Sequence, residues 1–145
     1  MQDWKQMFLQ YFRLGEPGLN NATYILNYPQ VKQIQEGSDE DRRMVEGFCA
    51  AVTSDEVGND LVMLILADLY GRMSLGTYDR LTVVFMKLLY PCWQEHYGML
   101  IGMLANLKTR PDSRTWQIIA RELDAYRARE DIAPEFLQAL AFYGF

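Results

Sequence analysis

Cys92, Glu95 and His96 form the densest group of residues whose chemistry could be catalytic. On a helix, Cys92 and His96 lie on one face, where they could act as a thiolate with a base or as half of a metal site. A zinc site would need two more ligands, and the chain has only one histidine and two cysteines. A cysteine nucleophile would need an orienting group and an anion hole. We therefore interpret the pair as a packed cysteine beside a histidine that is hydrogen-bonded or lies at the surface.

Asp68 is a second candidate, because it follows the apolar run Leu61–Ala67, where incomplete solvation could raise the pKa of a carboxyl group. Arg72 lies four residues further on, and an ion pair at this spacing is a sufficient structural explanation. The sequence contains no Glu-x-x-His pair, phosphate-binding loop, dinucleotide fingerprint or Gly-x-Ser-x-Gly elbow. We therefore expect a protein that is not an enzyme and that holds no metal or cofactor.

The acidic residues are concentrated in the first part of the chain. Residues 1–60 hold ten acids and five bases, a net charge of −5, whereas residues 61–145 hold nine of each. Capping explains many of these positions, because negative charge stabilises the start of a helix. As a surface, the same acids would steer a basic partner. The candidate partner-binding residues are Asp39, Glu40, Asp41, Asp55, Glu56 and Asp60.

A basic segment follows later, with six bases and three acids in residues 108–129. Arg114 and Arg121 are seven residues apart, so one helix face could hold phosphate or an acidic protein. A solvated helix face explains the pattern equally well, and the acidic chain as a whole disfavours direct binding of nucleic acid. Four tyrosines near the central helices could be interface anchors or ordinary core edges: Tyr70, Tyr78, Tyr90 and Tyr97.

Apolar residues recur at helical spacing along the chain, and this period predicts an all-α fold. The predicted helices are one over Asp3–Leu14, a short one through Tyr24–Leu26 that is followed by a further turn or two after Pro29, one capped by Ser38, one opened by a capping box at Thr53–Glu56, one capped by Thr77, and three that begin at Pro91, near Pro111 and at Pro134. The expected architecture is a single domain, residues 1–145, in which about seven or eight helices form a bundle of short-looped hairpins.

Two helices have features that predict how they pack. The helix through Leu61–Ala67 is apolar nearly all round, so we expect it to be the most buried one, with a buried strand as the alternative. Gly98 and Gly102 share a face of another helix, where a neighbouring helix could approach closely. The apolar end Ala141–Phe145 should dock on the helix at Asp3–Leu14, or else insert into a partner or a second copy.

The sequence also bears on location. Its start lacks the cationic and apolar segments of a secretion signal, and Leu61–Ala67 is about a third of the length that a bilayer crossing needs. Cys49 and Cys92 each lie in an apolar helical pattern, which is typical of unbridged core cysteines in a reducing compartment. We therefore expect a cytoplasmic protein without a membrane segment.

The functional prediction rests on elimination. A small acidic helical domain without catalytic residues is expected to act by covering the surface of another macromolecule, as immunity proteins and phage-encoded anti-defence inhibitors do. The expected partner is a protein with a basic or nucleic-acid-binding surface. The main alternative is a helical adaptor or a homodimer that uses apolar faces and the C-terminal aromatic residues. A nucleic-acid-binding regulator and a Cys/His enzyme are less favoured.

Overall fold

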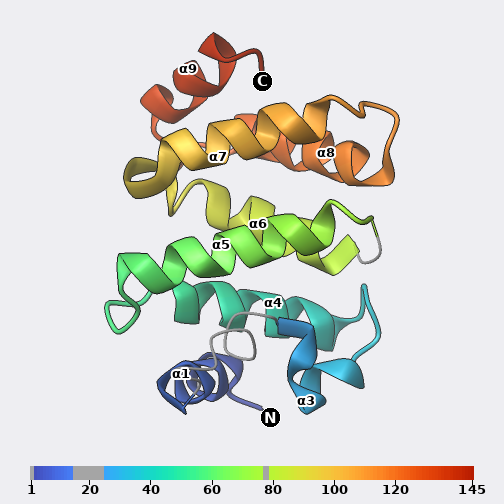
Figure 1. Ribbon diagram of the computed structural model, residues 1–145, viewed down its shortest axis with the longest axis vertical. Helices are drawn as coiled ribbons and strands as arrows, with labels where there is room; N and C mark the ends of the chain where they lie inside the picture. The colour runs from blue at the N-terminus through green and yellow to red at the C-terminus, as the bar shows by residue number, and fades with distance from the viewer. Residues whose placement is uncertain (1, 15–24, 77–78) are drawn as a thin grey trace. The chain divides into compact units, whose positions relative to one another are not determined.

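The computed structural model describes residues 2–14, 25–76 and 79–145. In these ranges the chain forms eight α-helices, one 3-10 helix and no strand (Figure 1), so the expected all-α helical bundle is confirmed. Contacts divide the chain into two compact units, which we call unit 1 (Met1–Gly71) and unit 2 (Arg72–Phe145). Predictions that concern Tyr24, Thr77 or Tyr78 lie outside the described residues.

Unit 1 is built on the packing of α1 against α4. Its elements are α1 (Trp4–Leu14), η1 (Ile25–Asn27), α3 (Pro29–Lys32), α4 (Asp39–Val52) and α5 (Asn59–Met73), the last of which continues into the first residues of unit 2. Helices α4 and α5 run in opposite directions, as expected for a helical hairpin (Figure 1). The core of the unit is aromatic: Phe8 and Phe48 are fully buried and meet edge to face, with ring centroids 4.9 Å apart.

The close approach of α1 to α4 depends on Gly47. A Cβ atom at this position would overlap Trp4 Cβ and would lie 3.0 Å from the backbone nitrogen of Lys5. The sequence prediction placed the close contact instead at Gly98 and Gly102, and this prediction is wrong. Both glycines are exposed, and a Cβ at either would meet no atom within 4 Å.

Unit 2 consists of α6 (Asp79–Leu89), α7 (Trp93–Lys108), α8 (Arg114–Ala128) and α9 (Pro134–Phe142). Helix α8 packs against both α6 and α7, and α7 and α8 form an antiparallel hairpin (Figure 1). Ser113 caps α8, because its Oγ accepts a hydrogen bond from the Trp116 N–H at 3.1 Å. The apolar side chains that recur at helical spacing along α6 are buried: Leu81, Val84, Phe85, Leu88 and Leu89.

Aromatic side chains fix α9 to the rest of unit 2. The Phe136 ring lies 4.8 Å from Tyr90, 5.1 Å from Trp93 and 5.4 Å from Tyr126, measured between centroids. At the other end of α9, Gly144 adopts a φ of 88°, which allows the N–H groups of Gly144 and Phe145 to bond back to Ala141 and Leu140. This pattern is a Schellman motif, in which Gly144 ends the helix.

The hydroxyl group of Tyr126 is expected to contribute measurably to the stability of unit 2. It donates to the Met86 carbonyl oxygen and accepts from the Tyr90 N–H. Tyr126→Phe should lower the free energy of unfolding by about 1–3 kcal/mol, because it leaves buried backbone groups without these partners. Urea denaturation would measure this change, and Tyr97→Phe, at a side chain that is 55% exposed, should have no effect. Equal losses in both variants would contradict the role of Tyr126.

The expected capping box at Thr53–Glu56 is wrong. Thr53 instead ends α4, where its Oγ1 donates to the Cys49 carbonyl, and the Ser54 Oγ accepts from the Glu56 N–H within a turn. Helix α5 begins only at Asn59, and it runs through Gly71 to Met73. The side chains of Thr53 and Ser54 thus serve a local turn, as short hydroxyl side chains often do.

No helix within the described ranges has both the length and the apolar character needed to cross a bilayer.

Candidate functional site

The structure places Cys92 and His96 at the start of α7 without joining them into a reactive pair. Cys92 is buried at the N-cap position, and His96 has non-helical backbone angles that kink the helix. The His96 Nε2 atom is buried and has no hydrogen-bond partner, so the thiol group of Cys92 does not bond to it. Among the described residues, no group of three His, Cys, Asp or Glu side chains could hold a metal ion.

Burial raises the pKa of the Cys92 thiol from its ordinary 9.0 to about 11. At pH 8 this shift leaves about a hundredfold less thiolate than in an unfolded chain, and the thiolate is the reactive form. We expect iodoacetamide to modify Cys92 slowly at pH 8 in the folded protein and rapidly in urea. Peptide mass spectrometry would follow the modification, with the half-buried Cys49 as the internal reference. Rapid modification of Cys92 in the folded chain would indicate an activated nucleophile.

Asp68 lies on α5 and is half-buried. Its charge contributes to a raised pKa of the Tyr28 phenol, although burial of Tyr28 is the largest cause and the nearby Tyr11 is the second. The Tyr11 and Tyr28 rings stack with centroids 4.5 Å apart. Asp68 therefore lies close enough to Tyr28 for its charge to act on the phenol, which favours a structural role for this carboxylate.

The basic segment of unit 2 is engaged in ion pairs within that unit. Arg114 pairs with Asp79 at 2.9 Å, Arg127 with Asp124 at 2.8 Å and Arg129 with Asp131 at 2.6 Å. Arg121 lies 4.0 Å from Glu122. Because these carboxylates offset the arginine charges, the segment presents a mixed surface, whereas a phosphate-binding surface is strongly basic.

The candidate tyrosines have different environments. The Tyr90 hydroxyl accepts a hydrogen bond from the Ala133 N–H at 3.0 Å, so Tyr90 belongs to the fold of unit 2. Tyr70 is half-buried, and Tyr97 is 55% exposed. Of these three side chains, Tyr97 is the one open to a partner.

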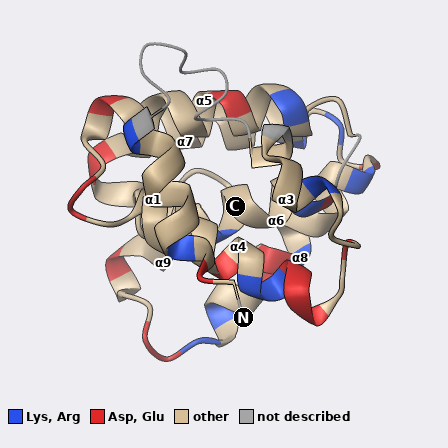
Figure 2. Ribbon diagram, turned by 90° about the horizontal axis from the view of Figure 1, so that it is seen from below, with Lys and Arg blue, Asp and Glu red and all other residues tan. Residues whose placement is uncertain are grey.

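The six candidate acids form two groups at opposite ends of α4. Asp39, Glu40 and Asp41 occupy its first turn, and Asp55, Glu56 and Asp60 lie in the turn after α4 and at the start of α5. Figure 2 shows acidic and basic residues next to each other near the start of α4. In the second group, Glu56 pairs with Arg13 of α1, whereas Asp55 and Asp60 are exposed. The structure thus brings the acids together as two clusters within unit 1.

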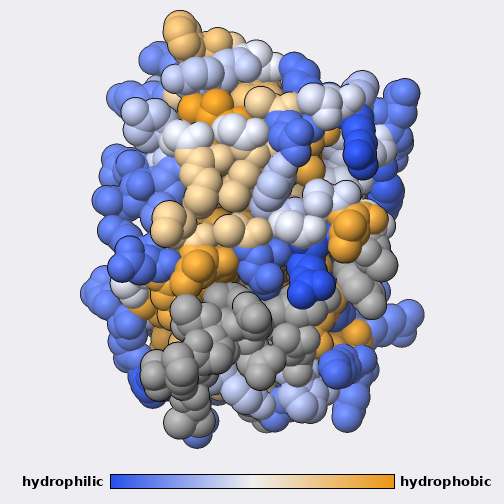
Figure 3. Space-filling model, viewed as in Figure 1, coloured by the Kyte–Doolittle hydropathy of each residue, from blue (hydrophilic) through white to orange (hydrophobic). Residues whose placement is uncertain are grey.

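Helix α5 presents an exposed, largely apolar face, which we call the α5 face. The buried side of this helix carries Val62, Ile65, Leu66 and Leu69, and the α5 face consists of Asp60, Met63, Leu64, Ala67 and Gly71. Met63 is 44% exposed and Leu64 is 40% exposed, so the prediction that this helix is the most buried one is wrong. Apolar side chains gather over α5 in the space-filling view (Figure 3). The sequence could not separate the two sides of α5, because apolar residues occur on both.

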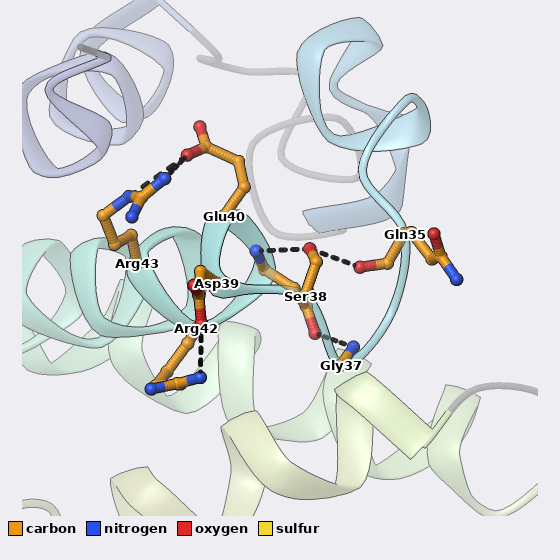
Figure 4. Close-up of polar contacts among 8 residues, drawn as sticks. Gln35, Gly37, Ser38, Asp39, Glu40, Arg42 and Arg43 are labelled. Atoms are coloured by element: carbon orange, nitrogen blue, oxygen red, sulfur yellow. Dashed lines mark hydrogen bonds and ion pairs between the residues drawn. The ribbon is translucent and has the colours of Figure 1, made fainter.

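The polar groups in the first turn of α4 form hydrogen bonds and ion pairs with residues close to them in the sequence (Figure 4). Ser38 caps the helix as predicted, since its Oγ accepts from the Asp41 N–H at 3.1 Å. The buried Asp41 accepts from the Gly37 N–H at 2.9 Å. Asp39 pairs with Arg42 at 2.7 Å.

Glu40 is held from two sides. It pairs with Arg43 and accepts a hydrogen bond from the Trp4 indole N–H at 3.1 Å. The bond from Arg43 is the main reason why the pKa of the Glu40 carboxyl is lowered. Of the three acids at the start of α4, Asp39 is therefore the most available to a partner, with 79% of its side chain exposed.

Of the C-terminal residues, Phe145 packs against unit 2, whereas Phe142 and Tyr143 are exposed. The Phe145 ring lies 6.3 Å from Trp116, with the Lys108 ammonium 5.5 Å from its centroid, so this end docks on unit 2. The prediction that it docks on the helix at Asp3–Leu14 is therefore wrong. Phe142 is 82% exposed and Tyr143 is 46% exposed, and these two rings contact each other.

Comparison of the chain with protein-family models, curated proteins and solved structures finds no match.

Proposed function

We propose that this chain is a non-catalytic inhibitor that covers a basic surface of a protein target with the acidic side of unit 1. The observation that carries the proposal is the division of charge between the units. Unit 1 has eleven acids and five bases, a net charge of −6, whereas unit 2 has eight acids and nine bases, a net charge of +1. Exposed carboxylates at both ends of α4, those of Asp39 and Asp55, would meet the positive charges of the target.

The spacing of the two acidic groups suits an interface of ordinary size. Helix α4 has 14 residues, which corresponds to a length of about 20 Å at the rise of an α-helix. A stable interface covers about 800 Å² on each partner, and a patch of this area is somewhat wider than α4 is long. Both groups could therefore lie at the rim of one interface, where charges speed association and select the partner.

A basic surface of this extent is typical of a protein that binds nucleic acid. Occupying such a surface would block the target in a one-to-one complex, as immunity proteins and phage-encoded anti-defence inhibitors do. The proposal includes a cytoplasmic, reducing setting. The unbridged state of Cys49 and Cys92 supports that setting.

The test compares three forms of the chain as bait in an extract of the source cells. The double variant Asp39→Asn/Asp55→Asn removes one exposed charge from each acidic group. The matched control, Asp112→Asn/Glu130→Gln, removes two exposed charges from unit 2. We expect the wild type and the control to capture the same basic protein and to inhibit it fully at one copy per target. We expect the double variant to capture less of this protein and to inhibit it only at a higher concentration. Equal capture by all three forms would refute the proposal.

A further inference from the structure

We draw no further inference here: the strongest candidate, the exposed apolar patch that Met63 and Leu64 form on the α5 face, carries none, because nothing in the structure shows what covers it.

Discussion

Phe48→Ala is expected to cost unit 1 about 3–5 kcal/mol of stability, a large share of the stability of a domain of this size. The Phe48 ring is fully buried and packs edge-on against Phe8. The centroid of the Phe12 ring lies 6.0 Å from that of Phe48 in the same core. Its removal leaves a cavity that the surrounding helices cannot fill without moving. Hydrogen exchange measured by mass spectrometry should show faster exchange in α1 and α4, and urea denaturation should show a lower midpoint.

Phe142→Ala is the matched control for this prediction, because it removes the same side chain from a position that is 82% exposed. We expect a change within about 0.5 kcal/mol, as for most surface substitutions. A similar loss of stability in both variants would show that Phe48 is not part of a packed core.

Gly47→Ala is expected to destabilise unit 1 by about 1–3 kcal/mol, although alanine is the better helix former. The added Cβ would overlap Trp4 Cβ and crowd the backbone of Lys5, and neither atom is the free end of a flexible side chain. Helix α1 would therefore have to move away from α4. Faster hydrogen exchange in α1, with α8 unchanged, would locate the effect in unit 1.

Gly102→Ala makes the same substitution in α7, where a Cβ would meet no atom within 4 Å. We expect this variant to be more stable by up to about 1 kcal/mol, because alanine restricts the unfolded chain and favours the helix. The two glycine variants should thus change stability in opposite directions. A gain of stability in Gly47→Ala would contradict the close packing of α1 on α4.

Local signals in the sequence predicted the helices well where one face of a helix is clearly apolar. The prediction Asp3–Leu14 matches α1 (Trp4–Leu14), and the predicted cap at Ser38 has its hydrogen bond. These features depend on residues within one or two helical turns of each other, so a single sequence contains the information.

Contacts between distant residues could not be predicted in this way. Arg13 pairs with Glu56 and Arg114 pairs with Asp79, although these partners are 43 and 35 residues apart. The sequence therefore indicated the acidic and basic segments but not how much of their charge is balanced within each unit. Gly47 was missed for the same reason, because its role depends on α1, which lies about forty residues earlier.

The exposed side of α5 was missed for a different reason. Its apolar residues surround the helix, so the period that normally separates a buried side from an exposed one is weak. The structure, in which Met63 is 44% and Leu64 is 40% exposed, separates the two sides of the helix. The sequence identified the six acids from their charge alone. The structure then showed that the carboxylates of Glu40 and Asp41 accept hydrogen bonds within unit 1, whereas that of Asp55 is exposed.

The most direct measurement of the central claim is the rate at which the captured target associates with the chain at several salt concentrations. If unit 1 binds through its acidic groups, the wild type should associate rapidly and slow down steeply as salt increases. Asp39→Asn/Asp55→Asn should associate more slowly and depend less on salt, whereas the control Asp112→Asn/Glu130→Gln should behave as the wild type. Identical rates and salt dependence for all three forms would contradict the claim that this protein acts through the acidic surface of unit 1.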